Sequence, residues 1–215
     1  MLDVHPPHDP LHGWRDFLIH LVTITIGLLI ALSLEGLVEW QHHRHLVHDA
    51  EASLHAEIQS NAQGMPGVLA DLRKRQDILK QDVAVLKVVI KTHKLPDHSS
   101  IDIGFGIRSF DSVSWKTAQS TGALSYMPYD LAQEYSNIYG TQDLLAASEQ
   151  QAARDAIIAL GPFLNAQDSD GDPTPEQAEA VKEKIEVLQG QILLVSSFMQ
   201  NLDGEYKKFL AAHPD

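Results

Sequence analysis

The chain has no cysteine among its 215 residues, so it can form neither a disulfide nor a metal site with thiolate ligands. Basic residues are few, since 16 Lys and Arg stand against 29 Asp and Glu and give a net charge of −13. This acidic balance argues against a broad nucleic-acid-binding surface, and we expect no nucleic acid as a partner. Phosphate loops, nucleophile elbows, zinc-protease helices and dinucleotide fingerprints are also missing, which indicates a protein that is not an enzyme.

One uncharged apolar run, Phe17 to Leu34, lies near the amino terminus. Its 18 residues are enough for a transmembrane helix, and Trp14 and Trp40 flank it as aromatic residues flank membrane spans. The tail before it holds acidic residues, and no small-residue cleavage site follows it, so a signal peptide fits the pattern less well. We predict a flexible tail over 1–13 and one transmembrane helix over 14–40, with the core helix of a soluble domain as the alternative.

Several small or polar residues share one side of this predicted helix. At 100° per residue, His20, Gly27 and Ala31 point in nearly the same direction, and Thr23 and Glu35 lie on either side of them. Thr23, Gly27 and Ala31 recur every fourth residue, a small-residue spacing that lets two helices approach closely in lipid. We predict that these five residues meet another membrane helix, from a second copy or a different protein. The alternative is that His20 and Glu35 lie among the lipid headgroups.

Helical periodicity continues after Trp40, and no sustained strand pattern or internal repeat is present. One helix is predicted over 41–63 and another over 68–94, whose apolar residues recur with the period of an a/d seam. The intervening sequence GMPG, residues 64–67, combines two glycines with a proline and predicts a turn.

The second half of the chain predicts two more long helices and a short one. The first long helix covers 129–161, and the second begins at Thr174, which is followed by Pro at N1 and by Gln at N3 as in a capping box. The short helix begins at Asp111 or Ser112 and ends before Gly122, which stands at its C′ position.

Four seam-bearing helices with short connections predict an all-α protein, in which one transmembrane helix continues into an antiparallel four-helix bundle. The bundle domain would cover 41–215. Its up-and-down order would gather many histidines in one layer near the membrane. This predicted histidine layer comprises His42, His43, His45, His48, His93, His98 and His213.

Two segments resemble a family of uncharacterised bacterial single-pass membrane proteins. They are IGLLIALSLEGLVEW, residues 26–40, and LHAEIQSN, residues 54–61. Family members have a glycine-containing membrane helix that ends near a Trp-Glu or Glu-Trp pair, here Glu39-Trp40 in the less common order. They also share a W-x-x-A-x-x-x-G-x-L element, here Trp115, Ala118, Gly122 and Leu124. The resemblance implies a location and a fold, a bacterial inner membrane protein with a helical domain, and no activity.

The basic residues around the predicted span leave its orientation open. Arg15 precedes the span and Arg44 follows it, so neither side has an excess of positive charge. A short tail before a single span favours a bundle on the extracytoplasmic side of the inner (cytoplasmic) membrane.

Histidine and acidic clusters suggest two ion sites. His45, His48 and His55 have helical spacing, so they could bind a metal ion or respond to pH, or else be interface residues beside the headgroups. A calcium loop would also need Asp168, Asp170, Asp172 and Glu179 at its positions 1, 3, 5 and 12. Pro173 stands where that loop needs glycine, so the alternative is a solvated loop between two helices.

A run of basic residues on the helix at 68–94 is interleaved with aspartates. Arg73, Lys74 and Arg75 predict a solvated, salt-bridged face, or a docking surface for an acidic partner. No cofactor is predicted.

Taken together, these patterns predict a membrane-anchored accessory or scaffold subunit that acts by helix–helix association. Its partners would be the lipid bilayer and either other membrane protein subunits or further copies of the same chain. The alternative function is a sensor or ligand-binding module that responds to metal, pH or a small molecule, through the membrane-proximal histidines or the 97–126 segment.

Overall fold

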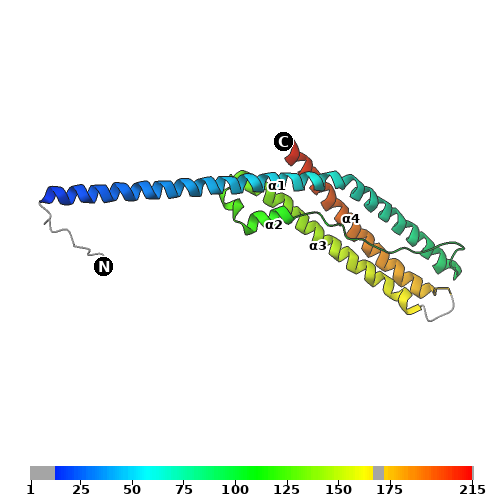
Figure 1. Cartoon of the computed structure of the whole chain (residues 1–215). Helices are drawn as coiled ribbons and strands as arrows, with labels where there is room; N and C mark the ends of the chain where they lie inside the picture. Colours follow the sequence, from blue (N-terminus) through cyan, green and yellow to red (C-terminus); the bar gives the residue numbers. More distant parts are fainter. Residues whose placement is uncertain (1–12, 167–171, 215) are drawn as a thin grey trace, which may run out of the picture. The chain divides into compact units, whose positions relative to one another are not determined.

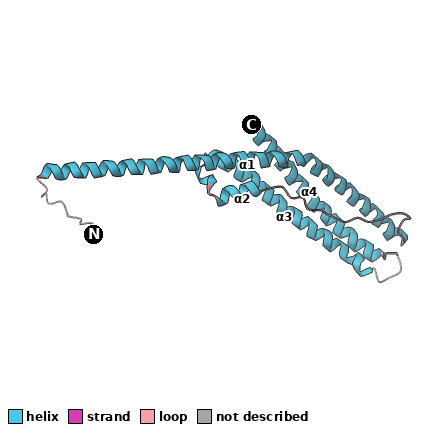
Figure 2. Ribbon diagram, viewed as in Figure 1, coloured by secondary structure: helices cyan, strands magenta, loops and turns pink. Residues whose placement is uncertain are grey.

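A computed structural model describes residues 13–166 and 172–214, in which every regular element is a helix (Figures 1 and 2). The all-α prediction is therefore confirmed for the described part of the chain. The elements are α1 (Trp14–Thr92), α2 (Val113–Ser120), the short 3-10 helix η1 (Ala123–Tyr126), α3 (Tyr129–Ala166) and α4 (Pro175–Ala212).

The described residues form two compact units that divide within α1, between Asp49 and Ala50. The first unit holds the amino-terminal part of α1. The second unit holds the rest of α1 together with α2, η1, α3 and α4.

The second unit buries the apolar seams of its three long helical segments. In α4 every predicted seam residue is buried, because apolar residues at alternating spacings of three and four stay on one face. The helix α3 runs alongside α4 in the opposite direction (Figure 1). The buried residues of α4 are Ala178, Val181, Ile185, Leu188, Ile192, Val195, Met199, Leu202, Tyr206 and Phe209.

The predicted turn at 64–67 is wrong, because α1 continues through it. Pro66 lies inside the helix, where proline costs about 3 kcal/mol of helix stability. Met65 beside it is fully buried, and the buried seam continues to Leu72 without a change of face, so packing outweighs the local propensity. The ribbon of α1 bends in its teal stretch (Figure 1), as expected for a helix that contains a proline.

This continuity changes the predicted bundle. One helix crosses the region 41–92 in which two were expected, so the antiparallel four-helix bundle is not confirmed. In place of a second long helix, residues 93–112 form an irregular segment that leads back along α1 to α2 (Figure 2). We call residues 93–112 the strap.

The short helix α2 and its end agree with the sequence prediction. Ser112 is its N-cap residue and Thr121 its C-cap residue, and Gly122 follows with a φ of +76°. Glycine suits this position because side chains with a Cβ rarely adopt the left-handed conformation.

The amino terminus of α4 has the predicted capping box. The Gln177 amide donates to the Thr174 hydroxyl at 3.3 Å, and the Thr174 amide donates to the Gln177 side-chain oxygen at 2.8 Å. Replacing Thr174 by Ala should lower the free energy of unfolding by about 1 kcal/mol, because the Gln177 amide loses the hydroxyl that accepts its hydrogen bond. Urea unfolding at equilibrium would measure this loss. Thr174→Ser, which keeps the hydroxyl, should recover most of it, and an equal loss in both variants would contradict the capping role.

The predicted histidine layer is wrong. His213 follows the last turn of α4, where its backbone oxygen lies 2.8 Å from Nε2 of His55. His93 lies instead at the opposite end of the second unit, near Glu176, whose pKa is lowered mainly by a backbone hydrogen bond and to a smaller extent by His93. Because α4 separates the two ends by about 55 Å of helix, His93 and His213 cannot belong to one layer.

Candidate functional site

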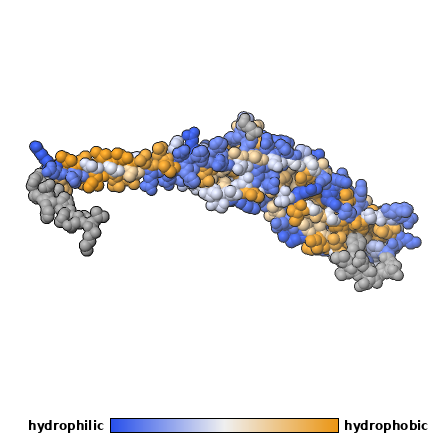
Figure 3. All heavy atoms as spheres, in the orientation of Figure 1, coloured by the Kyte–Doolittle hydropathy of each residue, from blue (hydrophilic) through white to orange (hydrophobic). Residues whose placement is uncertain are grey.

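The amino-terminal part of α1 has an apolar surface on all sides. Every residue from Trp14 to Trp40 is exposed within the chain, and large aliphatic side chains dominate this stretch (Figure 3). Within the described residues, α1 is the single helix whose length and apolar composition would allow it to cross a membrane.

The hydroxyl groups of this stretch are satisfied within the helix. Thr23, Thr25 and Ser33 each donate to the backbone oxygen four residues earlier, at distances of 2.7–2.8 Å. A hydroxyl that is bonded in this way adds no unsatisfied donor to an apolar surrounding. The local structure is therefore compatible with a lipid environment.

The predicted interface residues all lie on this exposed stretch. His20, Thr23, Gly27, Ala31 and Glu35 are exposed, and a Cβ added to Gly27 would meet no atom within 4 Å. The described structure contains one chain, so contact between this face and another helix stays a prediction.

The two flanking tryptophans contact their own helix. The rings of Trp14 and Phe17 lie 5.8 Å apart, and the Arg44 guanidinium lies 5.5 Å from the centre of a Trp40 ring. Trp14 and Trp40 are 72% and 57% exposed, which suits side chains at a membrane interface.

A second candidate site lies in the second unit, where helix side chains hold the backbone of the strap and of α2. An irregular segment has backbone amides without helical partners, and a buried amide must find an acceptor. Four buried polar side chains supply those acceptors. They are Glu57, Asn61 and Asp82 on α1 and Glu149 on α3.

Near α2 these contacts are paired. The Asp111 amide donates to the side-chain oxygen of Asn61 at 3.0 Å, and the Asn61 amide group donates back to the Asp111 carbonyl at 2.8 Å. Glu57 accepts one bond from the Ser114 amide at 2.7 Å and another from the Tyr139 hydroxyl at 2.6 Å. Burial raises the pKa of Tyr139 and Glu57 raises it further, so its phenol stays protonated and donates.

Aromatic packing supports the same region. The rings of Trp115 in α2 and Tyr139 in α3 stack 4.9 Å apart and nearly parallel. Gln142 donates to the Tyr206 hydroxyl at 2.7 Å, and Phe110 of the strap meets the Tyr206 ring edge-on. These rings fix α2 and the last part of the strap against α3 and α4.

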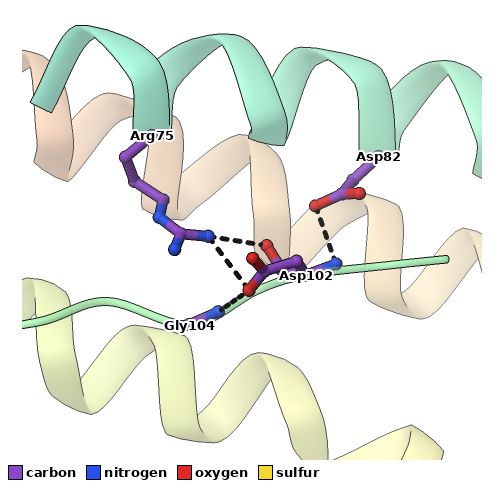
Figure 4. A network of polar contacts seen from close by, with 4 residues as sticks. All are labelled: Arg75, Asp82, Asp102 and Gly104. Atoms are coloured by element: carbon purple, nitrogen blue, oxygen red, sulfur yellow. Dashed lines mark hydrogen bonds and ion pairs between the residues drawn. The ribbon is translucent and has the colours of Figure 1, made fainter. Parts of the chain in front are cut away.

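The first part of the strap is held by the network in Figure 4. The Asp102 amide donates to Asp82 at 3.2 Å, and Arg75 contacts both the backbone oxygen and the carboxylate of Asp102 at 3.0 Å. The Gly104 amide donates to the same carboxylate at 3.1 Å. Asp102 therefore joins the strap to two turns of α1, through Arg75 and Asp82.

The register of these contacts shows that the strap is almost fully extended. Asp82 to Asn61 is about 32 Å along α1 at 1.5 Å per residue. Their partners, Asp102 and Asp111, are nine residues apart, which is at most about 32 Å of extended chain. Between these two anchor points the strap is therefore close to its maximum extended length.

A cleft of about 440 Å³ lies between the strap and the helices. Leu72 and Met199 line it with apolar groups, and Arg108 pairs with Asp71 across it. The Arg108 amide donates to Glu149, another lining residue, at 3.3 Å. The cleft thus combines apolar walls with a buried carboxyl and three cations, which are Lys74, Arg75 and Arg108.

Burial changes the acidity of the two carboxyls beneath the strap. Burial raises the pKa of Asp82 to about 6, although the bond from the Asp102 amide partly offsets the change. Burial likewise raises the pKa of Glu149 to about 7, and Arg108 partly offsets it. Asp102 differs because its hydrogen bond to Arg75 lowers its pKa. Glu149 is therefore close to half protonated at neutral pH.

The predicted ion sites gain no support from the described residues. His45 and His48 belong to the first unit and His55 to the second, and no group of three or more His, Asp or Glu side chains there is arranged to hold a metal ion. Asp168 and Asp170 of the predicted calcium loop lie outside the described residues. Glu179 of that loop is on α4, where it pairs with Lys182, and Asp172 precedes the helix.

The sequence prediction missed the residues that hold the strap. Glu57 and Asn61 follow Leu54 at spacings of three and four residues, on one face of the helix, and a polar residue at a buried position of this kind is a signal that it has a buried partner. Asp82 and Glu149 gave no such signal, because their partners are backbone amides of a segment whose path the sequence does not reveal.

Comparison of the chain with known protein families, curated proteins and solved structures finds no match. The resemblance to the bacterial single-pass family is therefore not confirmed.

Proposed function

We propose that the protein is a membrane-anchored accessory or scaffold subunit, in which residues 14–40 cross the bilayer and the helical second unit works outside it. The observation that supports this proposal is the contrast between the two units. The second unit buries its own apolar seams, whereas the apolar side chains of 14–40 are all exposed. An exposed apolar surface of this extent is stable in lipid or against another protein, and not in water.

The proposed location is a bacterial inner (cytoplasmic) membrane, with the second unit on the extracytoplasmic side. Sedimentation of the full-length chain in the absence of detergent tests the anchoring. We expect it in the membrane pellet, with release by detergent and not by high salt. A monomer that stays in the supernatant would end the proposal.

The proposed mechanism is lateral association through the face that contains His20, Gly27 and Ala31. Small residues let two helix backbones approach closely, so a large side chain at Gly27 should block the contact without harming the helix itself. We expect Gly27→Leu to shift the protein from its assembled form to smaller species in a mild detergent. Size-exclusion chromatography with light scattering would measure the shift.

Gly36 provides a matched control, because it lies nine residues from Gly27 and therefore on the opposite side of the helix. It too has open space around its Cβ position. Gly36→Leu makes the same chemical change and should leave the assembly intact. Equal behaviour of the two variants would argue against a specific Gly27 face.

One observation favours a second function, a module that responds to pH or to a small molecule. The cleft beside the strap is large enough for a small ligand and contains a carboxyl, Glu149, whose pKa is about 7. A ligand that binds only the folded protein must raise its melting temperature. Screening zinc and small carboxylates or amines by thermal unfolding would test this function, and an unchanged melting temperature throughout would count against it.

A further inference from the structure

The charges of the chain are separated along its sequence. Residues 68–110 contain eight of the 16 Lys and Arg and only five of the 29 Asp and Glu. This segment therefore has a net charge of +3, while the remainder of the chain has −16. A basic region within such an acidic protein is a specific electrostatic feature of its surface.

Four of the basic residues form a ridge, three on the last turns of α1 and one two residues after its end. Lys80, Lys87 and Lys94 are seven residues apart, and Lys91 lies one turn after Lys87. All four side chains are exposed. We call Lys80, Lys87, Lys91 and Lys94 the basic ridge.

An acidic ridge lies on the first turns of α4. Glu176, Glu179, Glu183 and Glu186 follow one another at helical spacings of three and four, and all except the half-buried Glu179 are exposed. Like charges at these spacings repel each other and destabilise an isolated helix. Two lysines, Lys182 and Lys184, lie on the same stretch, and Lys182 pairs with Glu179.

The two ridges lie at the same end of the second unit. His93 acts electrostatically on Glu176, so the end of α1 is beside the beginning of α4, as the green and orange ribbons show (Figure 1). The helical part of the basic ridge, from Lys80 to Lys91, extends about 16 Å along α1, and the acidic ridge extends about 15 Å along α4. No ion pair joins one ridge to the other within the described part of the chain.

We propose that the basic ridge of one copy of this chain docks on the acidic ridge of a second copy. The inference rests on the proposed membrane anchoring, because copies anchored in one bilayer by the same segment are concentrated there with their second units on the same side. Lys87, Lys91 and Lys94 would then face Glu176, Glu183 and Glu186 of the neighbour. Lys80 and Glu179 already have partners in their own chain, Asp77 and Lys182. The partner of the second unit in this contact is a second copy of the chain. The Gly27 face belongs to a separate proposed contact, which involves the membrane segment.

Charge reversal of the full-length chain in mild detergent tests the contact. Lys87→Glu with Lys91→Glu, and separately Glu183→Lys with Glu186→Lys, should each weaken self-association at least tenfold at about 0.1 M salt. Mixing the two variants should restore assembly, because each then offers the charge that the other lacks. Light scattering across a concentration series would measure both effects, and 1 M salt should weaken the wild-type assembly.

A control pair, Lys116→Glu with Arg154→Glu, makes the same change in net charge as the lysine variant but away from both ridges, and should leave the assembly unchanged. Circular dichroism would confirm that each variant is folded, as expected for exposed positions. Wild-type assembly of both ridge variants, or failure of their mixture to associate, would overturn the inference. Loss of assembly only in the lysine variant would also overturn it, because the basic ridge would then bind a different acidic surface.

These outcomes separate the inference from the proposed function. Assembly that depends on Gly27 but not on either ridge would reject the ridge contact and keep the membrane-helix proposal. Assembly that depends on the ridges but not on Gly27 would reject the proposed membrane-helix contact instead.

Discussion

Replacing Glu57 by Ala should lower the free energy of unfolding of the second unit by about 3 kcal/mol, which is a large part of the stability of a typical domain. Glu57 is 9% exposed and is the acceptor for both the Ser114 amide and the Tyr139 hydroxyl. Its removal leaves two donors without an acceptor, and the Tyr139 ring is almost completely buried. Each unsatisfied buried donor costs about 1–3 kcal/mol.

Two further variants would divide this loss between the two hydrogen bonds. Tyr139→Phe removes one donor together with its need for an acceptor, so it should cost only about 1 kcal/mol. Combining it with Glu57→Ala should cost less than the sum of the single changes, because the two residues share one bond. Urea unfolding followed by tryptophan fluorescence suits the measurement, since Trp115 stacks on Tyr139.

An exposed position nearby supplies the control. Gln63→Ala changes a side chain on an exposed part of α1 and should alter stability by less than about 0.5 kcal/mol. If Glu57→Ala were as mild as Gln63→Ala, the strap and α2 would not depend on the contacts that the structure shows for Glu57.

The sequence predicted those parts of the fold in which local signals agree with packing. The α4 seam, the capping box at Thr174 and the glycine after α2 were all predicted correctly. In each case the deciding interaction joins residues within a few positions of each other, so the local sequence is enough to predict the structure.

The failures came where distant residues decide the structure. Gly64, Pro66 and Gly67 form a strong local turn signal, yet α1 is continuous and Met65 within it is fully buried. The strap is a similar case, because its path depends on the acceptors Asp82, Glu149 and Asn61, which are 20 to 50 residues away from their donors in the sequence. The histidine layer failed for the same reason, because a continuous α1 places His93 at the end of the second unit opposite His213.

Stability of the second unit should fall as the pH rises from about 5 to 7, and Glu149→Gln should remove most of this dependence. The usual pKa of the Glu149 carboxyl is 4.5, and burial raises it to about 7 in the folded protein. Between these values the folded state keeps a proton that the unfolded state has lost. Stability therefore decreases with rising pH by up to about 3 kcal/mol, and the loss is complete above pH 7.

The glutamine variant should consequently be more stable than the wild type at pH 8 and similar to it at pH 5. Its side-chain oxygen can still accept the bond from the Arg108 amide, so only the titration is removed. Below pH 6 a weaker dependence of the same sign should persist, because Asp82 has a raised pKa of about 6. Urea unfolding from pH 5 to 8 would measure both profiles.

Glu149→Ala distinguishes the titration from the hydrogen bond. It also removes the ionisable group, but it leaves the Arg108 amide without its acceptor and opens a cavity beside the strap. Its stability should therefore be independent of pH above about 6 and yet lower than that of Glu149→Gln at every pH. If both variants kept the wild-type dependence of stability on pH, a different group would control the response. That result would contradict the proposal that the cleft is a pH-responsive site.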